Sequence, residues 1–364
     1  MTRWFAIAGL ALTSLTLPLL AQEATGEEKK TPIKISWKDG KTTIESDNAA
    51  VNISNRVQFR FTLEDPEAGE SKGSFRIRRG KTKFDGWFYN KNLTYELQLN
   101  WPDTANPLED ANINYDFGAK ALQIKAGQFK VPFGRQELTS SGSQQFVDRS
   151  IVSSEFAKGR DAGVQLWGVA LNEMVDWRFG VFNGNGRTRS ANDNDAFQYN
   201  ARVTFQPWGD VKYSESDFES GDHPRFAIAA GYENNDSHGA TGGNDLAREI
   251  LGTDAAFKFR GLSAFAEYFR RDHDPEAGAD SESAGVHGQI GYFVIPKKLE
   301  IAARYASIDP SDMMGEDGQT ETGIAVGWFW NQHNLKLQGD LRQIENDAND
   351  ATNKEARVQL QFIF

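Results

Sequence analysis

A two-residue alternation of apolar and polar side chains runs through most of the chain and continues to its last residue, Phe364. Successive side chains of a β-strand point to opposite faces, so each alternating segment is predicted as a strand with one apolar and one polar face. No segment carries a sustained apolar stripe of period 3.6, so little helix is expected. The pattern is clearest in Val51–Leu63, Asn92–Trp101, Phe197–Phe205 and Glu355–Phe364.

Twelve further segments show the same alternation more weakly, which brings the predicted total to sixteen strands. An even number of antiparallel strands is typical of single-chain bacterial outer-membrane barrels. The expected fold is therefore an all-β, transmembrane antiparallel barrel of about 16 strands. The twelve weaker segments are 74–88, 111–117, 121–130, 160–170, 174–182, 225–233, 250–260, 262–271, 284–293, 299–307, 320–330 and 334–343.

The connections between these segments alternate between short and long. Outer-membrane barrels have short turns at the periplasmic end and longer loops outside, and the alternation fits that asymmetry. One connection breaks the rule, because residues 206–224 form a long link where a short periplasmic turn is expected. A missed strand and a functional turn both remain open for it.

A soluble β-sandwich is the main structural alternative for period-two strands. Aromatic residues near the predicted strand ends favour the barrel, because aromatic girdles mark the two membrane interfaces. The terminal strand also ends on an aromatic residue, with Phe362, Leu360, Val358 and Ala356 along one face. The predicted girdle residues are Trp87, Trp101, Trp167, Trp177, Tyr232, Tyr292, Trp328 and Trp330.

The N-terminus predicts export. Residues 1–21 combine a short basic start, an apolar stretch and a plausible cleavage point at Ala21-Gln22, as in a secretory signal peptide. No second apolar run is long enough for a spanning helix, so insertion into a membrane must use strands. Residues 22–50 read as a short hairpin within a periplasmic leader, with a periplasmic plug as the alternative, and residues 51–364 as the barrel in the outer membrane of a Gram-negative cell.

Catalysis is weakly supported. The chain has no cysteine, and its five histidines show no metal-ligand spacing, so no metal, cofactor or catalytic residue is predicted. A phospholipase-type barrel would need a histidine and a serine together on a strand, and His287 with Ser283 is only a weak approach to that. With a net charge of −11, no nucleic-acid partner is expected.

Charge placement suggests a basic lumen inside an acidic protein. If the apolar face of each strand points outward, Arg56, Arg60 and Lys125 point inward, and the excess acid lies in the loops. The alternative is a water-filled lumen in which arginines and carboxylates balance without selectivity. The full set of predicted inward bases is Arg56, Arg60, Arg76, Arg78, Lys125, Arg178, Arg202, Lys258, Arg260, Arg304, Lys336, Arg342 and Arg357.

Two segments are candidate anion contacts. Arg76, Arg78 and Arg79 place three guanidinium groups within four residues, and such forks bind oxyanions bidentately. Arg79 would point outward unless a bulge near Gly80 redirects it. The longest connection, 131–159, has the length to fold inward as a constriction that offers Ser140, Ser141 and Arg149, whereas covering the outer mouth is the alternative.

These residues carry a family resemblance. The runs Gly127–Gly134 (GQFKVPFG), Glu137–Ser141 (ELTSS), Phe146–Ser150 (FVDRS) and Gly159–Leu166 (GRDAGVQL) resemble the phosphate-selective porin family of the porin O and P type. The similarity extends from about Ile33 to Phe364 and is most specific in the first half.

The resemblance implies a homotrimeric outer-membrane channel of sixteen strands that passes phosphate or polyphosphate. Arg76, Arg78 and Arg79 would then belong to an arginine ladder, and Ser140, Ser141 and Arg149 to the constriction. Glu137 stands where a strict phosphate channel is expected to carry lysine. A general diffusion porin therefore remains the alternative within this class, and a secreted β-sandwich binding protein the alternative outside it.

Overall fold

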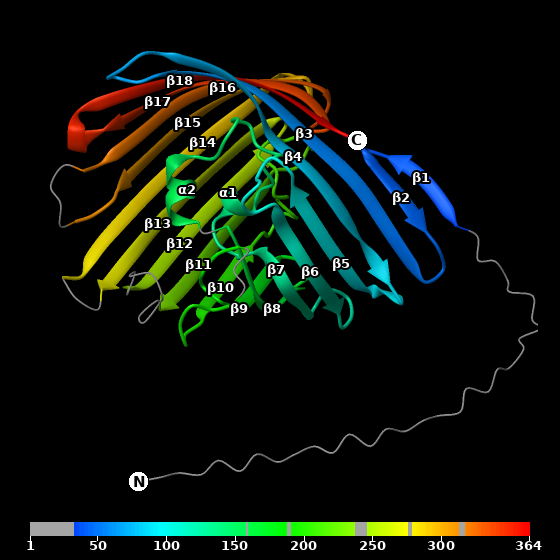
Figure 1. Ribbon diagram of the computed structural model, residues 1–364. Coiled ribbons are helices and arrows are strands. Elements are labelled where there is room, and N and C mark those ends of the chain that lie inside the picture. Colours follow the sequence, from blue (N-terminus) through cyan, green and yellow to red (C-terminus); the bar gives the residue numbers. More distant parts are fainter. Residues whose placement is uncertain (1–32, 158, 188–190, 237–245, 276–278, 313–316) are drawn as a thin grey trace, which may run out of the picture. The chain divides into compact units, whose positions relative to one another are not determined.

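The sixteen predicted strands all form, and they close into one antiparallel ring (Figure 1). The computed structural model describes residues 33–157, 159–187, 191–236, 246–275, 279–312 and 317–364. The barrel strands are β3 (Ala49–Asp65), β4 (Lys72–Phe88), β5 (Asn90–Asn100), β6 (Leu108–Asp116), β7 (Gln123–Lys130), β8 (Arg160–Ala170), β9 (Val175–Phe182), β10 (Gln198–Phe205), β11 (Arg225–Asp236), β12 (Leu246–Phe259), β13 (Leu262–Pro275), β14 (Ser281–Ile295), β15 (Leu299–Asp309), β16 (Gln319–Asn331), β17 (Leu335–Asn346) and β18 (Ala351–Ile363).

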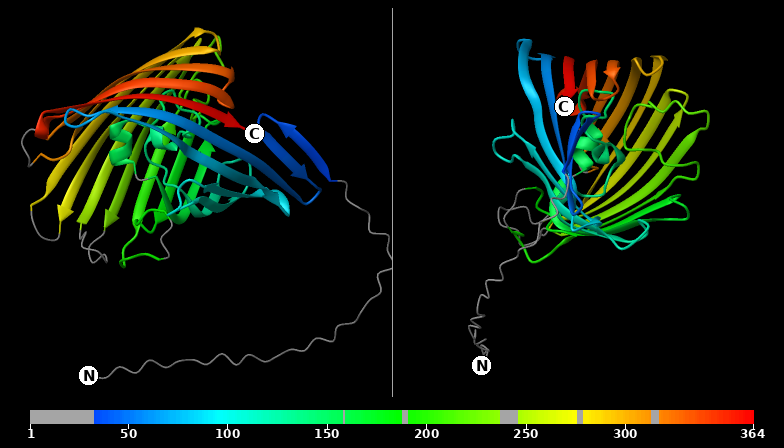
Figure 2. Two further views of the ribbon diagram at one scale, coloured as in Figure 1. Left: turned by 45° about the horizontal axis from the view of Figure 1, so that its top comes forward. Right: turned by 90° about the vertical axis from the view of Figure 1, so that its right-hand side faces the viewer.

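The first and last barrel strands complete the ring. β3 pairs with β4 along one edge and with β18 along the other. At the end of β18, Asn55 and Phe364 exchange backbone hydrogen bonds of 2.7 and 2.9 Å. The curved wall is visible from two further directions in Figure 2. A single closed sheet excludes the β-sandwich alternative, which requires two sheets packed face to face.

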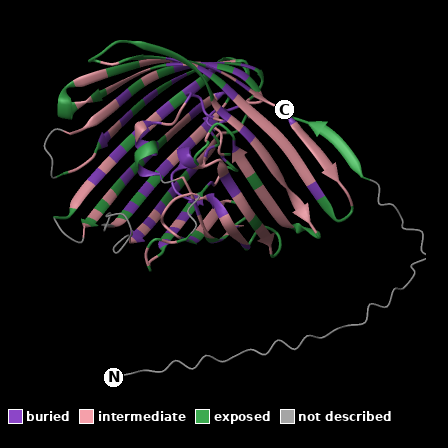
Figure 3. Cartoon of the chain, viewed as in Figure 1, coloured by how far each residue is buried: buried purple, intermediate pink, exposed green. Residues whose placement is uncertain are grey.

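The two faces of the wall differ as the alternation predicts. Large apolar side chains such as Ile324 and Leu341 are each 56% exposed on the outer surface. Polar side chains such as Lys336 and Gln359 point inward and are fully buried. Figure 3 shows the resulting bands of buried and exposed residues along the strands. Because the inward polar groups are buried, much of the lumen must be filled by other parts of the chain.

Two of the predicted girdle residues face the lumen instead. The indole nitrogen of Trp167 donates to Asn114 at 2.8 Å, and the Lys125 ammonium lies 5.6 Å from the ring centroid of Trp167. Trp87 shares the strand face of Lys83 and therefore also points inward. Amphipathic indole rings suit a polar lumen as well as an interface, so the residue type alone did not distinguish the two positions.

The connection 131–159 folds into the barrel and carries two short helices, α1 (Arg135–Leu138) and α2 (Ile151–Phe156). Its two ends are joined by the Val131 amide, which donates to the Gly159 carbonyl at 2.9 Å. Because loop residues such as Gln136 and Val152 are buried inside the barrel, the predicted constriction loop exists, and the alternative of a loop covering the outer mouth is wrong. No helix among the described residues is long and apolar enough to cross a membrane.

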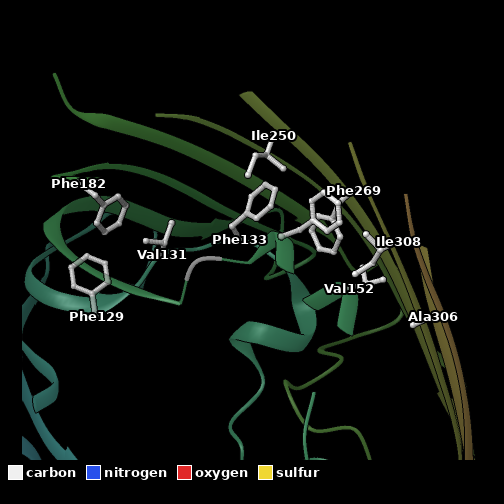
Figure 4. Close-up of a cluster of buried hydrophobic side chains, with 10 residues drawn as sticks. Phe129, Val131, Phe133, Val152, Phe182, Ile250, Phe269, Ala306 and Ile308 are labelled. Carbon is white, nitrogen blue, oxygen red and sulfur yellow. The ribbon is translucent and has the colours of Figure 1, made fainter. Parts of the chain in front are cut away.

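An apolar cluster holds this inward-folded loop against the barrel wall (Figure 4). Phe133 and Phe156 from the loop pack around Phe269 of β13, with ring centroids 5.5 and 5.6 Å from its own. Glycines make room for these rings, because a Cβ at Gly285 would lie 2.6 Å from Phe156 and one at Gly252 2.9 Å from Phe133. The buried cluster comprises Phe129, Val131, Phe133, Val152, Phe156, Phe182, Ile250, Phe269, Ala306 and Ile308.

The long connection 206–224 also folds into the barrel, from the end that carries the short turns. Val211 and Asp217 are buried, and the Glu215 amide donates to the carbonyl of Ser143 in the constriction loop at 2.9 Å. The carboxylate of Glu215 accepts from the Gln145 amide at 2.7 Å. This inserted turn contains no strand, so the possibility of a missed strand is wrong.

A small hairpin precedes the barrel. β1 (Lys34–Lys38) pairs with β2 (Lys41–Glu45), and β2 pairs with the first residues of β3. The predicted signal peptide, residues 1–21, lies outside the described residues.

We expect Phe156→Ala to loosen the constriction loop and leave the barrel folded. Loss of a buried phenyl group costs about 3 kcal/mol, and here that cost falls on loop docking. Hydrogen exchange of loop amides in detergent-solubilised protein should accelerate, whereas exchange of the strand amides should not. Phe179→Ala is the matched control, because Phe179 is exposed on the outer surface. Unchanged exchange of the loop in Phe156→Ala would contradict the anchoring role of the cluster.

Candidate functional site

A cavity of about 460 Å³ lies between the constriction loop and the inner wall formed by β3–β9. Its lining contains eleven basic and four acidic side chains, an excess of seven bases. Serine hydroxyls from the loop, amides from β5, β6 and β8, and the apolar side chains of Phe129 and Leu138 complete the lining. The bases are Arg56, Arg78, Arg79, Lys81, Lys83, Lys125, Lys130, Arg149, Arg160, Arg178 and Arg187, and the acids are Glu96, Asp103, Glu109 and Asp110.

One strand, β4, supplies a row of these bases. The register with β3 pairs Gln58 with Arg79 and Phe59 with Ile77, so Arg78 is an extra residue in a β-bulge. Because of this bulge, both Arg78 and Arg79 turn inward, although they are adjacent in sequence. The predicted bulge therefore exists, one residue before Arg79 rather than at Gly80.

The bulge also changes which later residues face the lumen. After Arg79 the inward positions are odd-numbered, so Lys81 and Lys83 line the cavity. Alternate residues of a strand are about 6.6 Å apart, so Arg79, Lys81 and Lys83 span about 13 Å, and with Arg78 the row of β4 bases is at most about 16 Å long. Uninterrupted alternation from Arg76 would have pointed both lysines at lipid, and for this reason the sequence analysis missed them.

Arg56 connects this wall to the constriction loop. Its two terminal nitrogens donate to the hydroxyls of Ser140 and Ser141 at 2.9 and 3.1 Å. The contact brings Arg56, predicted as a lumen base, together with Ser140 and Ser141, predicted as loop donors, at the cavity surface. Each hydroxyl keeps a proton that it can donate to a hydrogen-bond acceptor in the cavity.

Lys125 stands on the opposite flank of the cavity. Its ammonium lies 5.4 Å from the ring centroid of Phe129 and 5.6 Å from that of Trp167. Within the described part of the chain, no carboxylate comes close enough to Lys125 to form an ion pair. Lys125 therefore offers a charge that the protein itself does not neutralise by contact.

The carboxylates of the cavity are all engaged by bases. Glu109 pairs with Lys81, and Arg160 donates two hydrogen bonds of 3.0 and 2.8 Å to the Asp110 carboxylate. The other two carboxylates are also paired: Glu96 lies 3.0 Å from Lys83, and Asp103 pairs with Arg187. Paired carboxylates present little free negative charge to the interior of the cavity.

Arg60 contacts the loop rather than the cavity. Its guanidinium is buried, donates to Asp148 at 2.5 Å and to the Val147 carbonyl at 3.1 Å, and does not line the cavity. Asp148 also lies within 3.1 Å of Arg79, 3.8 Å of Arg78 and 3.7 Å of Arg357. This group of four arginines around one carboxylate fastens the middle of the loop to β3, β4 and β18.

The arginines also stabilise the charged form of the Asp148 carboxylate. Burial alone would raise the pKa of Asp148, but the hydrogen bond from Arg60 and the charges of Arg79, Arg60 and Arg78 hold that pKa well below its ordinary range. The stabilisation is present at all pH values above the ordinary pKa of an aspartate. It is lost only as the pH falls through the lowered pKa.

Arg149 fixes the fold of the loop and touches the cavity. It donates to the carbonyls of Gln136 and Thr139 at 3.2 and 3.1 Å and pairs with Glu137 at 2.9 Å. The ammonium of Lys130 lies 3.8 Å from the same Glu137 carboxylate. Glu137 does not line the cavity, so the residue that departs from the family pattern adds no free negative charge to the path.

Two further predicted bases, Arg76 and Arg260, lie outside the cavity lining. Arg76 is on the inward face opposite Arg60 but is exposed near the outer end of β4 and outside the cavity lining. The prediction that Arg260 points into the lumen is wrong, because it sits in the tight turn between β12 and β13 with φ of 48°. Its guanidinium is exposed and lies 3.6 Å from Asp222. Arg260 ends an alternating run, so its face could not be assigned from period alone.

No group of three or more potential metal ligands occurs among the described residues. The suggested pair of His287 and Ser283 does not form, because the Ser283 hydroxyl contacts Arg271 and His273. His287 instead lies 3.4 Å from Glu267 in the filled part of the lumen.

We expect Asp148→Asn to release the middle of the loop. The neutral amide leaves Arg60 buried without its counter-charge, which is destabilising by about 3 kcal/mol. Loop amides should exchange faster and single-channel conductance should become noisier. In the wild type, loop exchange corrected for its intrinsic pH dependence should stay constant between pH 7 and pH 4, because the Asp148 carboxylate keeps its charge there. Loss of loop protection in the wild type at pH 4 would contradict this anchor.

Comparisons with known proteins agree with this architecture. Anion-selective porin from Comamonas acidovorans superimposes with a TM-score of 0.62 at 13% identity, covering 87% of this chain and all of that one. DcaP, an outer membrane channel of Acinetobacter baumannii, gives 0.60 at 11% identity over 87% of this chain and 98% of that one. An uncharacterised Aquifex aeolicus protein is 21% identical over 386 residues, spanning 93% of this chain and 91% of that protein.

The structural neighbours share the fold, and the family follows from the sequence. Residues 51–364 match the family model of phosphate-selective porin O and P. Family and fold together point to a channel of the outer membrane and not to an enzyme. With most of its length inside that match, the chain belongs to the phosphate-selective porin O and P family.

Proposed function

We propose that this outer-membrane porin prefers anions and conducts phosphate or polyphosphate through the cavity between the constriction loop and β3–β9. The observation that carries the proposal is the excess of seven basic side chains in the cavity lining. The inward faces of β12–β17 are buried under the two inserted segments, as at Asp254, His287 and Gln338. An ion crossing the barrel is thereby directed past the basic wall.

The proposed mechanism is a stepwise exchange of hydration for protein contacts. An oxyanion would leave part of its water shell and meet Arg78, Arg79, Lys81 and Lys83 in turn, with Lys125 across the path. Guanidinium forks match the geometry of phosphate oxygens, and several sites of moderate affinity allow an ion both to bind and to leave. The serines held by Arg56 would supply further donors at the narrow point.

A general diffusion porin without phosphate selectivity is the second candidate. It is favoured by the four carboxylates within the same lining, which offset part of the basic charge. The two candidates predict different reversal potentials across a planar bilayer with a salt gradient. An anion-preferring channel reverses toward the chloride potential and is blocked by added phosphate, whereas a general porin does neither.

We expect Lys125→Gln to reduce the preference for anions and weaken block by phosphate, each by about three- to tenfold, since one unpaired charge near the path contributes about 1 kcal/mol. Lys298→Gln is the matched control, because it removes the same charge from an exposed turn outside the cavity. The measurements are single-channel reversal potential and conductance at stepped phosphate concentration.

Reversal of the wild type toward the cation potential would reject the anion proposal. Equal effects of Lys125→Gln and Lys298→Gln would show that total charge, and not this cavity, sets the selectivity.

We further propose that residues 1–21 are removed on export and that the mature chain is a homotrimer. The basic and apolar start of the chain supports the first, and a structural neighbour, OmpT of Vibrio cholerae, has been solved in a trimer form. N-terminal sequencing of protein from outer membranes should begin at Gln22, and its mass in mild detergent should be three times that of one chain. An uncleaved start or a monomeric mass would contradict the corresponding proposal.

A further inference from the structure

The β1–β2 hairpin presents apolar side chains that the channel does not use. Ile33, Ile35 and Trp37 are 67%, 72% and 65% exposed. By comparison, Trp328 on the outer barrel surface is 37% exposed, because neighbouring strands flank it on both sides. Such a highly exposed cluster of isoleucine and tryptophan side chains is unfavourable in water, so we expect another apolar surface to cover it.

The apolar side of the hairpin is continuous with the lipid-facing side of the barrel. Ile35 pairs with Ile44, which in turn pairs with Val51 of β3. Val51 has the same parity along β3 as Phe59, which is 42% exposed on the outer surface. Ile35, Trp37 and Ile44 therefore extend the outer face of the wall rather than its inner face.

The opposite side of the hairpin is polar. Lys34, Ser36 and Lys38 alternate with the apolar residues of β1 and share a face with Lys41 and Thr43 of β2. An antiparallel hairpin with one apolar and one polar face suits a boundary between a lipid phase and water. The second edge of β1 has no strand partner among the described residues, so its backbone groups must meet water or polar headgroups rather than hydrocarbon.

The hairpin lies where such a boundary is expected. Its turn abuts the end of the barrel, because Asn334 donates to the Asp39 carbonyl at 3.2 Å and a Cβ at Gly40 would lie 2.8 Å from the Ile363 carbonyl oxygen. The hairpin then continues beyond the C-terminus (Figure 1). Five residues span about 17 Å, or about 12 Å along the axis of a tilted barrel, compared with about 5–8 Å for one headgroup layer.

We propose that the β1–β2 hairpin is a membrane-surface anchor whose Ile35, Trp37 and Ile44 side chains insert among phospholipid headgroups at the short-turn end of the barrel. Tryptophan favours that zone because its ring is apolar and its N–H is polar. The hairpin fixes the start of β3 against the membrane on the side where β18 ends. This role is independent of the ion that the channel passes.

The chain contains no cysteine, so single labels can be placed without background. Ile35→Cys and Ser36→Cys would each carry an environment-sensitive fluorophore in the full-length porin, reconstituted in phospholipid vesicles that contain a headgroup-linked nitroxide lipid. Adjacent positions on opposite faces make the pair a matched control, and unchanged conductance confirms that each variant is folded. Leu341→Cys on the outer barrel surface serves as the lipid-facing reference.

We expect a blue-shifted emission and about threefold stronger quenching for the label at position 35 than for the label at position 36. Equal, water-like emission at both positions would overturn the proposal. A blue-shifted label at position 35 that the nitroxide lipid does not quench would also overturn it, because a second copy of the chain or another protein would then cover the face.

Discussion

The structure depends on the pairing that closes β3 onto β18. In a hydrocarbon layer each backbone N–H or C=O without a partner costs several kcal/mol, so a spanning sheet is stable only when it has no open edge. Once the ring is closed, the two sides of every strand meet different solvents. The alternation of side chains then becomes an alternation between lipid and lumen, and the position of each charged group follows from its parity.

A ring of sixteen strands encloses more space than a selective channel needs. Here two segments, 131–159 and 206–224, enter from opposite ends and meet where Glu215 binds the backbone of Gln145. The filling is largely polar, since inward strand positions carry amides and charges that must find partners once water is displaced. Gln338 donates to the Gln144 and Gln145 carbonyls at 2.8 Å, and Gln58 donates to the Ser141 carbonyl at 3.1 Å.

The strands and the inward fold of the longest loop could be predicted from sequence, because period two and loop length are local properties. The identity of the pore-lining residues could be predicted only in part. The bulge at Arg78 reverses parity along β4, so Lys81 and Lys83 were missed although Arg78 and Arg79 were found. Contacts between segments distant in sequence were also inaccessible, as with Arg60, which bonds Asp148 instead of facing the path. The inserted turn 206–224 has no pattern that distinguishes it from an ordinary loop.

The net charge of the chain and the charge of the cavity lining have opposite signs. The protein carries −11 overall, whereas the cavity lining has seven more bases than acids. Screening explains how both can hold, because exposed charges farther apart than about 8 Å interact weakly at physiological ionic strength. Carboxylates at the strand ends, such as Asp272 and Glu282, are solvated and distant in strand register from Lys125. The proposed selectivity therefore depends on the few charges that the inserted loop leaves exposed in the cavity, and not on the composition of the chain.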